Sequence, residues 1–155
     1  MTPARTLRVF TRGALGGTPV AVFDDADACA PAEMQSLAAE LGAPTTAFVL
    51  RPRREDCAAR VRVFSPTREL PMEVAPMLAV ASLKSPSHAV NLELGVLSVS
   101  VAPKGDRWGM LLPRTLLGGL RSAWRIETAR ARRAATRTSH RSRIDTGPSA
   151  STQRR

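Results

Sequence analysis

The stretch Pro31-Ala-Glu-Met-Gln-Ser-Leu-Ala-Ala-Glu-Leu-Gly42 carries the clearest secondary-structure signal in this chain. Its apolar residues recur at the i, i+3, i+4 and i+7 spacing of one helix face, and they are Met34, Leu37, Ala38 and Leu41. Proline suits the first turn of a helix, and a glycine after the last turn is a common stop. We therefore predict a helix from Pro31 to Leu41.

Strand-like runs lie on both sides of this helix. In the run Ala58–Phe64, valines alternate with arginines, which is typical of a half-buried strand. Together with Thr45–Leu50 and the turn Arg51–Asp56, this run predicts a β-hairpin. Further strands are predicted at Leu7–Thr11, Val20–Phe23, Asn91–Leu94, Val96–Val101 and Trp108–Leu112, loops at Gly13–Pro19 and Ser65–Pro71, and a short helix at Pro76–Lys84. The pattern predicts an α+β fold in which strands wrap around a central helix.

The positive charge of the chain is concentrated at its C-terminal end. The formal net charge is +10 over 155 residues. Residues 1–120 hold 13 Lys and Arg against 11 Asp and Glu, whereas residues 121–155 hold 10 Arg against Glu127 and Asp145. We expect one folded domain over residues 1–115, followed by an Arg-rich tail over residues 116–155. The tail has few large apolar side chains to bury, so it is predicted to be disordered.

Two interpretations of the tail remain open. Its tract Arg130–Arg137 would bind RNA or DNA nonspecifically through phosphate contacts. The tail offers only Trp124 for base stacking, so nucleic acid is not the partner we favour. The abrupt change in composition is also typical of a truncated or shifted reading frame, and this is the interpretation we prefer.

Several residue types argue against other classes of site. Cys29 and Cys57 form no CxxC pair and have no histidine at metal-ligand spacing, so neither a disulfide framework nor a metal site is predicted. His88 stands in a polar loop and is expected to be solvated. No apolar run reaches the length of a membrane span or of a signal-peptide core. We expect a cytoplasmic protein that makes no membrane contact.

Five blocks of sequence follow one another in a specific order and spacing. They are Arg8-Val-Phe-Thr11, Gly16-Gly-Thr-Pro-Val-Ala-Val22, Met34-Gln-Ser-Leu-Ala-Ala-Glu-Leu41, Thr46-Ala-Phe-Val49 and Val61-Arg-Val-Phe-Ser-Pro-Thr-Arg-Glu-Leu-Pro71. This series resembles the phenazine biosynthesis PhzF-like family, which shares its fold with diaminopimelate epimerase. The resemblance covers roughly residues 5–113. It implies one half of a two-half fold, each half being a mixed, barrel-like sheet around a central helix, with the active site between the halves.

The resemblance also implies two site positions on the strands. Where the family reads G-G-N-P, this chain has Thr18, which makes Thr18 a candidate substrate-binding residue. Where the family reads S-E-T, Thr45 replaces a glutamate that moves a proton between carbons in related enzymes. A threonine hydroxyl does not titrate near neutral pH, so a role that contributes about 10²–10⁴ in rate is expected to be lost.

A third implied position is the loop that the family writes F-A-G-H-P-T. Here Val74 and Ala75 replace the glycine and the histidine, while Pro76 is retained, and all three are candidate substrate-binding positions. Glu73 is a new carboxylate in the same loop. We consider it either a relocated acid or base or an ordinary surface residue. The nearby Glu69 is expected to have a structural role within its turn.

Three functions follow from these observations. The first is a PhzF-like isomerase or epimerase that moves a proton on a small amino-acid-like or cyclic acid without a cofactor, and that is truncated and impaired or inactive. The second is a noncatalytic half-domain, or pseudoenzyme, which binds a partner or forms a homodimer through a face that a missing half would cover. The third is nucleic-acid binding through the tail.

Overall fold

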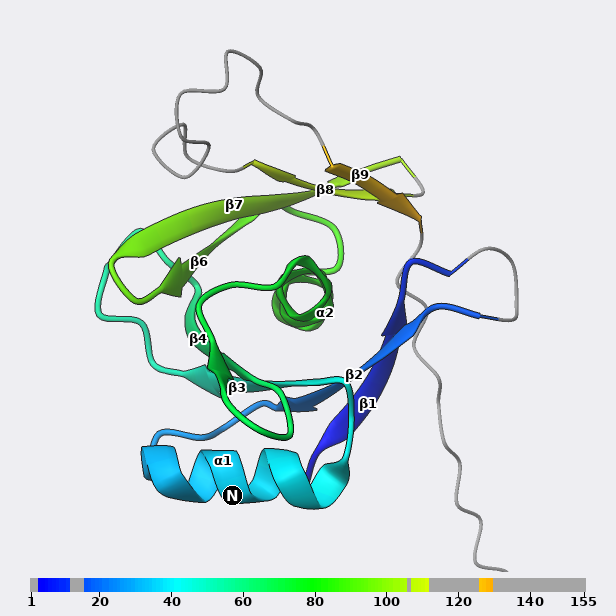
Figure 1. Cartoon of the computed structure of the whole chain (residues 1–155). Coiled ribbons are helices and arrows are strands. Elements are labelled where there is room, and N and C mark those ends of the chain that lie inside the picture. The colour runs from blue at the N-terminus through cyan, green and yellow to red at the C-terminus, as the bar shows by residue number, and fades with distance from the viewer. Residues whose placement is uncertain (1–2, 12–15, 106, 112–125, 130–155) are drawn as a thin grey trace, which may run out of the picture.

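The computed structural model describes residues 3–11, 16–105, 107–111 and 126–129 (Figure 1). Within these ranges the chain forms two helices and a series of strands that belong to a single sheet. The elements are β1 Arg5–Val9, β2 Thr18–Phe23, α1 Pro31–Leu41, β3 Thr45–Leu50, β4 Ala59–Phe64, β5 Glu69–Leu70, α2 Val74–Lys84, β6 Val90–Leu94, β7 Leu97–Lys104, β8 Arg107–Leu111 and β9 Ile126–Ala129.

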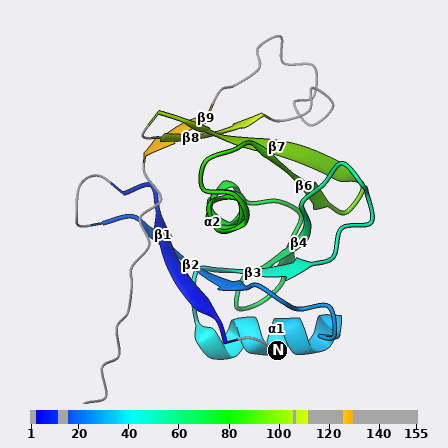
Figure 2. The same ribbon diagram turned by 180° about the vertical axis from the view of Figure 1, so that it is seen from behind.

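The sheet is mixed and runs in the order β1-β2-β3-β4-β6-β7-β8-β9, with β5 paired to β4 beside this path. The parallel pairs are β2 with β3 and β4 with β6, and each is joined through a helix, as a parallel crossover requires. The other pairs are antiparallel. The sheet curls around α2, whereas α1 lies outside it (Figures 1 and 2). This confirms the predicted α+β fold with a barrel-like sheet around a central helix.

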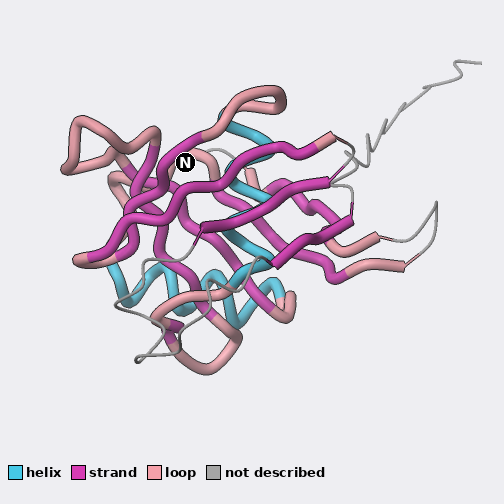
Figure 3. The backbone as a smooth tube through the Cα atoms, turned by 90° about the horizontal axis from the view of Figure 1, so that it is seen from above, coloured by secondary structure: helices cyan, strands magenta, loops and turns pink. Residues whose placement is uncertain are grey.

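The central helix, α2, is apolar on nearly all sides. Its residues from Ala75 to Ala81 are all buried, which is typical of a helix enclosed by protein rather than one lying on a surface. It packs against valines and leucines from the inner faces of the strands. Seen from above, the upper strands β7 to β9 lie over it (Figure 3). The sequence predicted this helix from Pro76, and the structure begins it two residues earlier, at Val74.

The outer helix, α1, has the predicted bounds. Pro31 begins it, and Gly42 ends it in the left-handed conformation with φ +59°. Met34 and Ala38 pack on phenylalanines of the outer sheet face, where the Phe23 and Phe48 rings stack with centroids 4.9 Å apart. Leu41 was expected on the buried face, but it stands in the last turn before the chain reverses and is 45% exposed.

The N-terminal strands differ from their predicted bounds. β1 ends at Val9 rather than Thr11, and the next residue, Phe10, has a positive φ of 58° that turns the chain. Pro19 was placed in a loop but pairs with Arg8 inside β2. The pairing of β2 with β3 begins only at Val20, so Pro19 has a strand neighbour on one side, where its missing N–H is tolerated.

The remaining strand predictions agree closely with the structure. The β3–β4 hairpin has the expected antiparallel pairing, and β8 overlaps the predicted strand, with Trp108 and Met110 buried. The segment Ser65–Pro71, expected to be a loop, contains the short strand β5, because Leu70 and Glu69 pair with the end of β4.

Most of the predicted disordered tail lies outside the described residues. Its four described residues, Ile126–Ala129, form β9 and pair antiparallel with β8 from Arg107 to Met110. These four residues thus add one strand to the sheet beside β8, and the predicted disorder of the tail stays a prediction. The tract Arg130–Arg137, Trp124 and His140 lie outside the described residues.

Candidate functional site

One end of the barrel brings together the predicted site positions. β2 and β3 run parallel with Val20 opposite Thr45, so the starts of both strands lie at the same end of the sheet. At the opposite end, Lys84 Nζ in the last turn of α2 lies 2.8 Å from Asp24 Oδ1, just after β2. Because α2 therefore runs along β2 in the same sense, its first turn points toward Thr18 and Thr45. We call this region the barrel end.

Thr45 presents its side chain to the interior of the barrel. Strand residues alternate between faces, and Ala47 and Val49 pack with the α2 cluster whereas Phe48 and Leu50 pack with the α1 cluster. Thr45 has the parity of the first group, so it faces α2. Its Oγ1 is buried and has no hydrogen-bond partner among the described residues. A neutral hydroxyl thus stands where the resemblance places an acid/base group.

The turn that leads into Thr18 requires glycine. Gly17 has φ +86°, and a Cβ there would lie 2.6 Å from Thr11 Cγ2 and 2.7 Å from the backbone oxygen of Val9. Gly16 also has a positive φ, +95°, but open space surrounds its Cα. Gly17 thus holds the start of β2 close to the end of β1.

The first turn of α2 contains the other predicted positions. Ala75 and Pro76 are buried, and Val74 is half-buried. Glu73 precedes the helix in extended conformation, is exposed, and makes no capping hydrogen bond to the helix. The loop thus offers one exposed carboxylate beside a helix start whose first N–H groups lack intrahelical acceptors. A side chain with the proton chemistry of histidine is absent at position 75.

Polar contacts hold the loop before α2 in place. Arg62 Nε and Nη2 each donate to Glu69 with a distance of 2.7 Å, which fixes β5 against β4. The hydrogen bond with Glu69 raises the pKa of the Arg62 guanidinium. Gln35 of α1 donates from Nε2 to the carbonyl oxygens of Ser65 and Pro66, each at 3.1 Å. The predicted structural role of Glu69 is confirmed.

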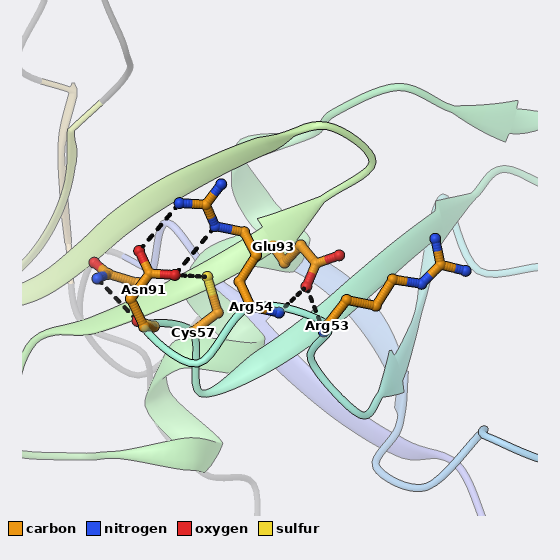
Figure 4. Close-up of polar contacts among 6 residues, drawn as sticks. Arg53, Arg54, Cys57, Asn91 and Glu93 are labelled. Atoms are coloured by element: carbon orange, nitrogen blue, oxygen red, sulfur yellow. Dashed lines mark hydrogen bonds and ion pairs between the residues drawn. The ribbon is translucent and has the colours of Figure 1, made fainter.

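A second polar cluster was not anticipated from the sequence (Figure 4). Glu93 in β6 is 3% exposed, and its Oε2 accepts the backbone N–H groups of Arg53 at 2.7 Å and Arg54 at 3.2 Å. The sequence signal was a charged residue inside the apolar run Leu92–Leu94. Glu93 closes the turn between β3 and β4, so its role is structural and lies away from the barrel end.

The two cysteines and His88 are further reactive side chains in the described part of the chain. Cys29 and Cys57 are free thiols, and burial raises the pKa of each. His88 is exposed, as expected. In the described part of the chain, no three His, Cys, Asp or Glu side chains gather as metal ligands, and no helix is long and apolar enough to cross a bilayer.

The sequence also matches a family model. The model for phenazine biosynthesis-like proteins (PhzC-PhzF) matches residues 7–96, which is more than half of the 155 residues. The chain belongs to the PhzF-like family. The match covers both sheet strands of the barrel end and the whole of α2, so the PhzF-like alignment includes every predicted site position.

PhzF-like relatives share only part of their length with this chain. It is 44% identical over 82 residues to trans-2,3-dihydro-3-hydroxyanthranilate isomerase of Pseudomonas fluorescens, which covers 51% of this chain and 29% of that protein. It is 30% identical over 112 residues to an uncharacterized isomerase of Clostridium acetobutylicum, covering 66% of this chain and 36% of that protein. The chain therefore spans about a third of the curated relatives it matches.

Solved structures agree with the PhzF-like fold. A predicted epimerase from Pseudomonas aeruginosa superposes with a TM-score of 0.61 at 30% identity, covering 70% of this chain and 42% of that chain. A PhzF-family protein from Bacillus anthracis superposes with a TM-score of 0.59 at 21% identity, covering 69% of this chain and 38% of that chain. The half-barrel thus corresponds to less than half of each of these larger folds.

Proposed function

We propose that this PhzF-like protein retains the barrel end of an isomerase but has impaired proton transfer. The observation that carries the proposal is Thr45, whose buried hydroxyl has no partner among the described residues and occupies the expected acid/base position. A hydroxyl cannot exchange a carbon-bound proton near neutral pH without a base beside it. Ala75 supplies no ring nitrogen, and Glu73 is the one carboxylate of the α2 loop.

The substrate class we propose is a small amino-acid-like or cyclic acid, acted on without a cofactor. It follows from the relatives that are named as isomerases of trans-2,3-dihydro-3-hydroxyanthranilate. The first turn of α2 supports this class, because unpaired N–H groups at a helix start favour a carboxylate. The cytoplasm is the compartment we propose.

Deuterium exchange provides the test. The full chain is incubated in D₂O with trans-2,3-dihydro-3-hydroxyanthranilate, and NMR follows loss of the carbon-bound proton, with the Pseudomonas fluorescens isomerase as reference. We expect exchange at least about 10² slower than in the reference, in line with the loss of one acid/base group. Thr45→Glu is expected to accelerate exchange, whereas the matched variant Thr45→Gln, which cannot titrate, is not.

Two results would change this assignment. Exchange at the reference rate by the unaltered chain, unaffected by Thr45→Gln, would contradict impairment at Thr45. If the unaltered chain does exchange and Glu73→Ala abolishes it, Glu73 is the relocated base and the chain is an active isomerase.

A second candidate function is self-association without catalysis. It is supported by apolar side chains that remain on the surface, with Val96 93% exposed and Leu111 63% exposed. Burying such side chains between two copies would remove apolar area from water. Light scattering on the full chain should then give twice the monomer mass, and Leu111→Lys should restore the monomer. A monomer at all concentrations would exclude this function.

A further inference from the structure

A groove of about 800 Å³ runs along the outer side of the barrel wall, away from Thr45. It lies between the first turn of α1, strand β4 and the turn that joins β6 to β7. Its volume is within the range of sites that hold small organic molecules. We call it the outer groove.

The outer groove forms where the sheet splits. On one side of β4, β6 pairs only with Ala59 and Arg60, and β5 pairs only with Val63 and Phe64. In these registers Val61 and Arg62 have no strand partner on that side. A gap between β5 and the end of β6 is therefore left in the wall, and its backbone polar groups face the groove rather than another strand.

Two arginines of the groove have no anionic partner among the described residues. Arg60 Nε is buried and makes no hydrogen bond within the described ranges, and the Arg53 guanidinium makes no ion pair there. Figure 4 shows the Arg53 side chain extending away from Glu93. Arg60 is the register neighbour of Glu93, but Glu93 is engaged by backbone N–H groups and forms no ion pair with Arg60 among these residues. A buried donor of a cation without an acceptor is costly, so an anion that enters the groove would gain a partner at Arg60 Nε.

The acidic residues of the groove do not supply this anion, because each already has a cation. Glu69 accepts both hydrogen bonds from Arg62, and Asp27 accepts from Arg51, with its Oδ2 3.1 Å from Arg51 Nε. The Arg-rich tail has the same sign of charge as the free arginines, so it is no occupant. The rest of the lining is largely apolar and includes Leu97 and the exposed Val96.

We propose that the outer groove binds a small organic anion, in which a carboxylate or phosphate group contacts Arg60 and Arg53 and an apolar body covers Val96 and Leu97. Planar guanidinium groups suit both oxyanions, since they present parallel N–H donors. This ligand site is separate from the barrel end, because Arg60 projects from the outer face of the wall.

The test uses benzoate, phenyl phosphate and the neutral analogue benzyl alcohol as probes, with NMR titration of the full, isotope-labelled chain. We expect one or both anions to shift the amide signals of Gly95 and Val96, and benzyl alcohol to shift them little. Comparison of benzoate with phenyl phosphate assigns the preferred oxyanion. Arg60→Gln should weaken binding about tenfold, which is the order of one charge-assisted hydrogen bond.

Matched variants keep the outcome clear. Arg53→Gln alters an exposed side chain, so it should leave the fold intact and weaken binding a few-fold, which covers the case in which Arg60→Gln unfolds. Arg68→Gln removes the same charge from an exposed loop outside the groove and should not change binding. The proposal is overturned if neither anion binds better than benzyl alcohol, if Arg68→Gln weakens binding as much as Arg53→Gln, or if protein concentration alone shifts these signals because a second copy fills the groove.

Discussion

The two faces of the wall formed by β2, β3 and β4 have diverged in chemistry. The inner face packs aliphatic side chains around α2 and ends at Thr45, which cannot titrate near neutral pH. The outer face packs phenylalanines under α1 and carries arginines on the part of β4 that α1 leaves open. The difference teaches that both faces are packed with apolar side chains, while the position where the resemblance places an acid/base group carries only the hydroxyl of Thr45.

The largest expected change in unfolding free energy comes from a substitution on the outer face. Phe48 is fully buried and contacts the rings of both Phe23 and Phe64, with centroids 4.9 and 5.4 Å away. Phe48→Ala should lower the free energy of unfolding by about 3–5 kcal/mol, because it opens a cavity between α1 and the sheet. Urea denaturation followed by circular dichroism measures this. Leu78→Ala, the matched change on the inner face, should cost about 2–5 kcal/mol, and a negligible cost for either would show that its face is not a packed core.

Gly17 gives the next largest effect, at the barrel end. Gly17→Ala combines a positive φ with a clash against the Val9 carbonyl oxygen, so we expect a loss of about 2–4 kcal/mol in unfolding free energy. Gly16→Ala is the control, because it has the positive φ without the clash and should cost about 1 kcal/mol. Equal losses for the two variants, measured by thermal or urea denaturation, would refute the close packing of β1 against β2.

Two adjacent threonines of β3 face opposite sides of the sheet, so substitutions at these positions compare the two faces within one strand. Thr45 faces α2 and Thr46 faces α1, and Oγ1 of each is buried with no hydrogen-bond partner in the part of the chain that the structure describes. Replacing either by valine removes an unsatisfied hydroxyl at nearly constant volume, so each variant should gain about 1 kcal/mol in unfolding free energy. Only Thr45→Val should alter binding of trans-2,3-dihydro-3-hydroxyanthranilate. If Thr46→Val alters it equally, the threonines do not separate the inner site from the outer face.

The smallest expected effect concerns the thiol of Cys57 in the turn after β3. Burial raises its pKa above the ordinary value of 9.0, so the folded thiol stays protonated when the unfolded thiol ionises. Stability should therefore fall as pH rises through about 9, where the unfolded chain loses a proton that the folded chain keeps. Urea midpoints at pH 8 and pH 10 measure the fall, and Cys57→Ala should reduce it. If the pH dependence of stability is unchanged in Cys57→Ala, titratable groups other than Cys57 cause the fall.

The sequence correctly predicted those elements whose helix or turn signals lie within the element itself. The proline start, apolar spacing and glycine stop of α1 are all contained in residues 31–42, so its bounds were correct. The β3–β4 hairpin was predicted equally well, because its strands are joined by a short turn. Errors occurred at Pro19 and in β5, where pairing with a strand elsewhere in the sheet overrides the local preference of the loop.

The candidate site was likewise predicted only in part from the sequence. Thr45, Glu73 and Ala75 were found from the sequence because the family motifs are contiguous and one substitution is visible at each position. The direction of α2 toward the barrel end was not predictable, because it is seen only in contacts between distant residues, such as Lys84 with Asp24. The same holds for the outer groove, which exists because β6 leaves β4 before β5 joins it.

Sequence alone was sufficient to specify both helices to within two residues, most of the strands and the family, and it predicts that Thr45 replaces an acid/base residue. Folding in three dimensions was needed to place α2 inside and α1 outside the sheet, to direct Thr45 toward α2, and to leave Arg60 Nε buried with no partner among the described residues. The physical reason is that helix periodicity and turn chemistry act between residues a few positions apart. Burial and charge pairing depend instead on neighbours such as Arg60 and Glu93, which are distant in the chain and meet only when the sheet closes.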